Sequence, residues 1–223
     1  LAERLSPQDL RTCLAGRLTA RQSLDAALAA AGGWAPFADA VAEALGADPT
    51  DTDDIALAAA AATLNEDEMR RLQTALLAGG KTAQAAASGP AAAFLATADP
   101  QQRLDALAEI FLTQKGAPRA NVVDNPAKKA APWADAFCRE KQAALLASLE
   151  RLKTARLYAH TRAFLTLLEA ALAEYGSRKA TRARLDYDDL IARARALFSS
   201  GEQAAWVLFK LDRGLEHILL DEA

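Results

Sequence analysis

The chain has 223 residues, of which 52% are hydrophobic and only 6% aromatic, and its formal net charge is -3. Alanine supplies about a quarter of the residues, which favours helices and leaves few β-branched or aromatic side chains for a sheet. The longest apolar stretch, Ile55 to Leu64, is much shorter than the roughly 20 residues that a membrane span needs. These figures exclude all-β and collagen-like folds, and predict a mostly α-helical protein that does not enter the membrane.

The two cysteines, Cys13 and Cys138, lie far apart in the sequence, and neither is near a histidine. No spacing typical of a zinc site is present. We therefore expect a reduced, cytoplasmic protein without structural zinc.

Helix start and stop signals divide the first half of the chain into short helices. Ser6 and Pro7 open the first helix, and Gly16 is its expected end. Asn65 with Glu68 three residues later forms a capping-box pattern before a later helix. The expected helices cover residues 7–16, 19–31, 34–45, 54–64, 65–77 and 103–111.

The second half begins with an irregular connection over residues 114–132, because glycine, proline and asparagine recur there. From Pro132 to Tyr175 apolar residues recur at helical intervals without a breaker, which predicts one helix of up to about 43 residues that ends at Gly176. Shorter helices are expected at 187–198, where Asp186 can cap, and at 203–211. The compact apolar run at 214–222 predicts a buried C-terminal strand.

Positive charge gathers in one block of an otherwise acidic chain. Residues 115–184 hold about 14 basic and 6 acidic residues, so this block is near +8. A block of this kind can neutralise several phosphates of DNA, although a solvated helix surface has the same composition. The candidate DNA-binding residues are Lys128, Lys129, Arg178, Lys179, Arg182 and Arg184.

Two short motifs bear on nucleotide binding. Gly79-Gly80-Lys81-Thr82 resembles the end of a phosphate-binding loop, but Ala75 stands where such a loop needs glycine, and the preceding residues are helical rather than a strand. A Gly-Gly helix stop is the better interpretation. Ile218-Leu-Leu-Asp221-Glu222, by contrast, has the pattern of a Walker B motif, in which the aspartate holds Mg²⁺ and the glutamate activates water.

Three blocks occur in a familiar order. Tyr175-x-x-x-Lys179 is followed by Leu185-Asp-Tyr-Asp-Asp-Leu-Ile191 and then by Ile218-Leu-Leu-Asp-Glu-Ala223. Together they resemble the UvrD/Rep superfamily 1 DNA helicases, in which a DFDDL-like block precedes a strand ending in DEAQD. The segments Phe111-Leu-Thr113 to Gly116-Ala-Pro-Arg119 and Trp206 to Asp212 are most similar to the AddA branch, the helicase subunit of the AddAB helicase-nuclease.

The resemblance implies a fragment of such a helicase. Residues 1–174 would form the helical insertion called 1B, with its long helix, and residues 175–223 part of a RecA-like α/β domain that ends in the Walker B strand. In the parent, Asp221 and Glu222 would bind Mg²⁺ beside ATP, and Glu222 would activate the attacking water. Because no Walker A motif is present in this chain, we expect the isolated piece to bind no cofactor and to hydrolyse no ATP.

The implied partners are DNA, bound without sequence preference, and an AddB-like subunit. The alternative that the residues leave open is an all-helical scaffold that binds another protein through its long helix, without nucleotide chemistry. A metal enzyme of the helical-bundle type lacks support, since no Glu-x-x-His pair occurs. An exposed C-terminal strand would also permit dimerisation through its edge.

Overall fold

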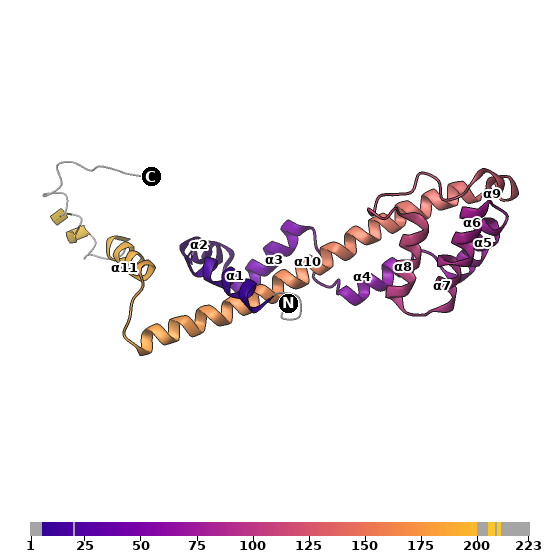
Figure 1. Ribbon diagram of the computed structural model, residues 1–223. Coiled ribbons are helices and arrows are strands. Elements are labelled where there is room, and N and C mark those ends of the chain that lie inside the picture. Colours follow the sequence, from indigo (N-terminus) through magenta and orange to yellow (C-terminus); the bar gives the residue numbers. More distant parts are fainter. Residues whose placement is uncertain (1–5, 20, 200–204, 208, 211–223) are drawn as a thin grey trace. The chain divides into compact units, whose positions relative to one another are not determined.

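The computed structural model describes residues 6–19, 21–199, 205–207 and 209–210 (Figure 1). This part of the chain is mostly α-helical, as expected, and its β structure is limited to one isolated antiparallel bridge between Leu112 and Pro118. The expected strand at 214–222 lies outside the described residues. Of the expected helix at 203–211, residues 205–207 and 209–210 are described, and they are helical. None of the described helices is both long and apolar enough to cross a membrane.

The chain divides into two compact units. The terminal unit comprises Leu1–Trp34 and Leu165–Ala223, and the central unit comprises Ala35–Phe164. The boundary expected after residue 174 stays a prediction. The helices are α1 (Pro7–Thr19), α2 (Arg21–Ala31), α3 (Trp34–Leu45), α4 (Asp53–Ala61), α5 (Glu66–Leu77), α6 (Lys81–Ser88), α7 (Pro90–Ala96), α8 (Pro100–Phe111), α9 (Asn125–Ala130), α10 (Ala134–Thr181) and α11 (Tyr187–Ser199).

The core of the central unit combines a few large side chains with many alanines. Phe94 on α7 and Phe111 on α8 are fully buried, as are Met69 and Leu72 on α5. Between them lie buried alanines, whose short side chains let helix backbones approach closely. The alanines of this core are Ala56, Ala60, Ala75, Ala83, Ala87, Ala91, Ala106, Ala127, Ala131, Ala134 and Ala155.

Capping residues set the starts of the helices in the central unit. The side chain of Asn65 accepts a hydrogen bond from the Glu68 amide, and the Glu68 side chain accepts one from the Asn65 amide, so the predicted capping box is present. The side chains of Thr52, Asp99 and Asp124 cap α4, α8 and α9, each by accepting a hydrogen bond from the backbone amide three residues later.

The segment from Phe111 to Arg119, one of those quoted for the resemblance, forms a tight turn in the central unit. The Arg119 amide donates to the Phe111 carbonyl at 2.9 Å, and Gly116 takes a φ of +76° at the tip. The Gln142 side chain on α10 donates to the carbonyl oxygens of both Phe111 and Arg119. The irregular segment is therefore fixed to α10.

Two glycines expected to end helices lie inside them. The helix α1 continues through Gly16 to Thr19, and α10 continues through Gly176 to Thr181, which makes α10 48 residues long. Glycine within a helix costs only about 1 kcal/mol relative to alanine, and the good helix formers on either side outweigh this cost. The expectation that these glycines terminate helices was wrong.

Three short helices were not expected. Two of them, α6 and α7, are alanine-rich and span only eight and seven residues, too few for a periodic apolar pattern to stand out. The six-residue α9 falls within the segment 114–132, which was expected to be irregular throughout. Its proline occupies the first turn, where the missing N–H of proline costs nothing, so the residue taken as a breaker begins a helix.

Candidate nucleic-acid interface

The helix α10 ends in a turn that contains a strained residue. Ala183 adopts a φ of +48°, a left-handed conformation that residues other than glycine seldom take. The Arg184 amide donates to the Lys179 carbonyl at 3.0 Å and the Ala183 amide to the Ala180 carbonyl at 3.1 Å. This is the Schellman pattern of helix termination, with alanine at the position that usually holds glycine. Arg182 and Arg184 therefore flank a backbone kink.

The spacing of the first two resemblance blocks has a physical basis here, because four of their polar residues meet beside this turn. The Lys179 ammonium lies 2.7 Å from the Asp186 carboxylate and 2.5 Å from that of Asp189. The Tyr175 hydroxyl donates to Asp186 at 3.0 Å, and the ammonium lies 4.7 Å from the Tyr175 ring. Tyr175 and Lys179 are one helical turn apart on α10, so both reach the first turn of α11.

Asp186 and Asp189 also cap α11. The Asp189 amide donates to the side chain of Asp186 at 2.9 Å, and the Asp186 amide donates to the side chain of Asp189 at 3.1 Å. This reciprocal pair is the carboxylate version of a capping box, and it confirms the predicted cap at Asp186. The two carboxylates therefore join the end of α10 to the start of α11.

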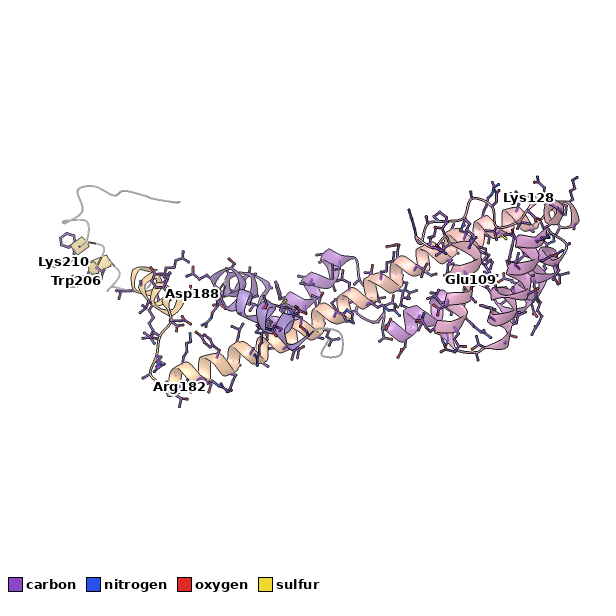
Figure 2. All side chains as sticks on the ribbon, in the orientation of Figure 1. Glu109, Lys128, Arg182, Asp188, Trp206 and Lys210 are labelled. Atoms are coloured by element: carbon purple, nitrogen blue, oxygen red, sulfur yellow. The ribbon has the colours of Figure 1, made fainter. Side chains whose placement is uncertain are left out.

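Two residues of α2 also contact the first turn of α11, and sequence reasoning missed both. The Arg21 guanidinium lies 3.5 Å from the Asp189 carboxylate, and the Gln22 amide donates to Asp188 at 3.3 Å. Figure 2 labels Asp188 at the start of α11. These contacts join positions more than 160 residues apart, and no sequence pattern signals them.

The cluster holds its members in defined protonation states. The hydrogen bond from Lys179 places the pKa of Asp186 well below its usual 3.8, and burial opposes this only in part. The pKa of Asp189 is lowered for the same reason. The hydrogen bond to Asp186 raises the pKa of the Tyr175 hydroxyl, which therefore stays protonated near neutrality. We call Tyr175, Lys179, Asp186, Asp189 and Arg21 the lysine-aspartate cluster.

A basic cavity of about 300 Å³ adjoins the lysine-aspartate cluster. Arg182, at the end of α10 (Figure 2), and Arg184 line it. Among the described residues neither guanidinium has a hydrogen-bonding or ion-pair partner. Arg178 also lines the cavity but pairs with Glu174 at 2.6 Å, an exposed contact of small energy. The full lining is Tyr175, Arg178, Lys179, Arg182, Arg184, Leu185 and Asp186.

The six candidate DNA-binding residues fall into two groups. Arg178, Lys179, Arg182 and Arg184 all line this one cavity in the terminal unit, whereas Lys128 and Lys129 lie on α9 in the central unit. Lys128, labelled in Figure 2, pairs with Asp135 at 2.8 Å, and Lys129 is exposed. The Lys179 side chain is only 13% exposed and is neutralised by its two carboxylates. Arg182 and Arg184 are thus the cations of the cavity that are open to a ligand.

The Gly79–Gly80 segment is part of the helix packing. The Gly80 amide donates to the Asp124 carboxylate at 2.6 Å, so this amide already has a side-chain partner. A Cβ at Gly79 would lie 2.6 Å from the Ala83 Cβ, so a larger residue would not fit there without a shift. The geometry agrees with a Gly-Gly stop followed by a new helix at Lys81.

Asp221 and Glu222, the predicted Mg²⁺-binding and water-activating acids, lie outside the described residues. Within the described ranges, no three His, Cys, Asp or Glu side chains come together as a metal site would require.

In comparisons with known proteins, no family model, no curated protein and no solved structure matches the chain.

Proposed function

We propose that this chain is a piece of an ATP-dependent DNA helicase of the UvrD/Rep type, closest to AddA, and that it contributes contacts to the DNA backbone. The observation that carries the proposal is the basic cavity, where Arg182 and Arg184 are exposed and have no partner among the described residues. Arginine presents a planar set of N–H donors that matches the oxygen atoms of a phosphate. Such contacts bind without regard to base sequence.

The convergence of the resemblance blocks supports the family assignment. Tyr175, Lys179, Asp186 and Asp189 were singled out as sequence letters, and they form one hydrogen-bonded cluster. Their contact gives the spacing of the first two blocks a structural role. In the parent helicase, ATP and Mg²⁺ would be served by Asp221 and Glu222, the partner would be an AddB-like subunit, and this piece alone would hydrolyse no ATP.

The DNA contact is tested by fluorescence anisotropy with a labelled oligonucleotide, single-stranded and duplex, at several salt concentrations. We expect weak binding that falls with salt, because cations released from DNA drive the association. The variant R182A/R184A should bind at least about 10-fold more weakly on duplex at low salt, and the slope of log K against log salt should fall by about 1.8.

The matched control is R193A/R195A, which removes the same charge from exposed positions of α11 outside the cavity lining. A change in net charge alone would weaken both variants equally. Equal loss in both variants, or no binding by the unmodified chain, would contradict the proposed contact and favour the helical scaffold.

The nucleotide role is tested in the full-length parent. Replacing Glu222 with Gln should abolish ATP turnover and spare nucleotide binding, because the amide cannot take a proton from the attacking water. Normal turnover by E222Q would remove the water-activating role from Glu222.

A further inference from the structure

We infer that the turn from Arg182 to Arg184 is a preorganised clamp for a backbone phosphate, and that Asp186 and Asp189 are positioning residues that hold this clamp although their own charge repels the ligand. The inference rests on the proposed function and deepens it. It separates the charges of the site into those that bind the phosphate and those that shape the binding surface.

The arginines are not needed to complete the helix end. Exposed basic residues after a helix commonly cap its last carbonyl groups. Here the carbonyls of Arg178, Lys179 and Ala180 accept hydrogen bonds from the amides of Arg182, Arg184 and Ala183 respectively. The Ser177 carbonyl accepts one from the Thr181 hydroxyl at 2.9 Å. The two guanidinium groups are therefore left for a ligand.

The turn is held from both sides. Lys179 lies before it on α10, Asp186 and Asp189 lie after it at the start of α11, and the ammonium bridges the gap. Because Ala183 is in the left-handed region, the backbone between these anchors would relax if they were released. The cluster thus fixes the conformation that places both arginines on one cavity.

Fixing the arginines in advance lowers the cost of binding. A long side chain on a loose turn loses conformational entropy when it binds, typically about 0.5–1.5 kcal/mol for each immobilised side chain. An anchored turn removes the backbone part of this cost. Two negative charges next to a phosphate site would otherwise reduce affinity, so the cluster has a role only if the positioning gain is the larger effect.

Positioning and simple electrostatics predict opposite results for one variant. D186N/D189N removes two negative charges beside the cavity and frees the Lys179 ammonium, so electrostatics alone predicts tighter DNA binding. Asparagine caps helices as well as aspartate does, so α11 keeps its start. If the acids hold the clamp, D186N/D189N instead binds labelled DNA about 3- to 10-fold more weakly than the unmodified 223-residue chain.

The control is E174Q, which removes one exposed negative charge a helical turn before Arg178 and leaves the turn intact. It should bind DNA as well as the unmodified chain or slightly better. Weaker binding by D186N/D189N together with undiminished binding by E174Q supports the inference. Equal or tighter binding by D186N/D189N overturns the inference. The proposed function is tested separately, because it depends on the loss of binding in R182A/R184A.

If circular dichroism shows that D186N/D189N loses helix, Y175F replaces it as the test. This variant removes one hydroxyl that donates to Asp186 and changes no charge. We expect about 2-fold weaker binding with an unchanged salt slope, because no phosphate contact is lost. An affinity equal to that of the unmodified chain would overturn the inference. Absence of binding by the unmodified chain would instead refute the proposed function itself.

Discussion

Lys179 and Asp186 form an ion pair of 2.7 Å across the turn that ends α10; the two residues are seven positions apart and belong to different sequence blocks. The pair turns two separate patterns, Tyr-x-x-x-Lys and Asp-x-x-Asp, into one structural unit. It also removes Lys179 from the set of cations that can meet a ligand, since its side chain is only 13% exposed. Lys179 belongs to the basic block by sequence, but its charge serves to hold the turn.

Exchanging glycine and alanine around the turn should change stability in a predictable direction. A183G should stabilise the chain by about 0.5–1 kcal/mol, because glycine takes the left-handed conformation without the steric cost that alanine bears. G176A should stabilise by a similar amount for the opposite reason, since Gly176 lies within α10 and a Cβ there would meet open space. Urea unfolding followed by circular dichroism measures both. Destabilisation by A183G would show that alanine bears no such steric cost at this position.

The two partners of the ion pair between Asp51 and Arg151 in the central unit differ in their exposure to solvent. The Arg151 guanidinium donates two hydrogen bonds to Asp51, whose side chain is 7% exposed, whereas Arg151 is 54% exposed. R151M keeps the aliphatic stem but leaves a buried carboxylate unpaired, whereas D51N leaves a cation that can turn to water. Thermal unfolding should therefore show the larger loss of stability in R151M. A larger loss in D51N would reverse this assignment of the buried partner.

The lysine-aspartate cluster should make stability depend on acid pH. The pKa of Asp186 is lowered in the folded chain from 3.8, so its contribution is complete above about pH 4 and is lost as the pH falls toward the folded pKa. D186N keeps the helix cap but not the charge. The stability difference between the unmodified chain and D186N should be constant from pH 7 to about pH 4 and then narrow. Urea unfolding at each pH measures it, and a difference that widens in acid would contradict the lowered pKa.

The two cysteines should react at very different rates. Cys138 is only 3% exposed, and burial, assisted by nearby Asp135, raises the pKa of its thiol to about 12. Cys13 is exposed on α1. An aromatic disulfide reagent at pH 8 should therefore modify one thiol in the folded chain and two in denaturant, because the thiolate is the reactive form. C13S is the control: rapid modification of its remaining thiol would mean that Cys138 is accessible.

The sequence predicts those helices whose ends are marked by side chains. Asn65 with Glu68 and Asp186 at the start of α11 were identified from residue type and spacing, because capping is a local interaction. Gly16 and Gly176 misled the prediction, since a glycine ends a helix only where the backbone turns left-handed. The residue that does so near the end of α10 is Ala183, and nothing in its type indicates it.

The candidate site was predictable in part. The basic block at 115–184 stands out by charge, and the cavity lies at its C-terminal end. The neutralisation of Lys179 and the approach of Arg21 depend on which helices pack together, and tertiary packing is not encoded in a local pattern. The Walker B prediction at Asp221 and Glu222 falls outside the described residues and stays a prediction.

The alanine-rich core of the central unit has a consequence for how the protein can vary. In most cores, mutations that shorten a side chain are the damaging ones, because they leave cavities. Here many core positions already carry alanine, so a random change there adds volume where helix backbones are close together. The positions least tolerant of replacement should therefore be small residues such as Ala60, Ala87 and Ala91, which are completely buried. In a library of random variants, the alanines at helix contacts should therefore be the positions with the fewest tolerated substitutions.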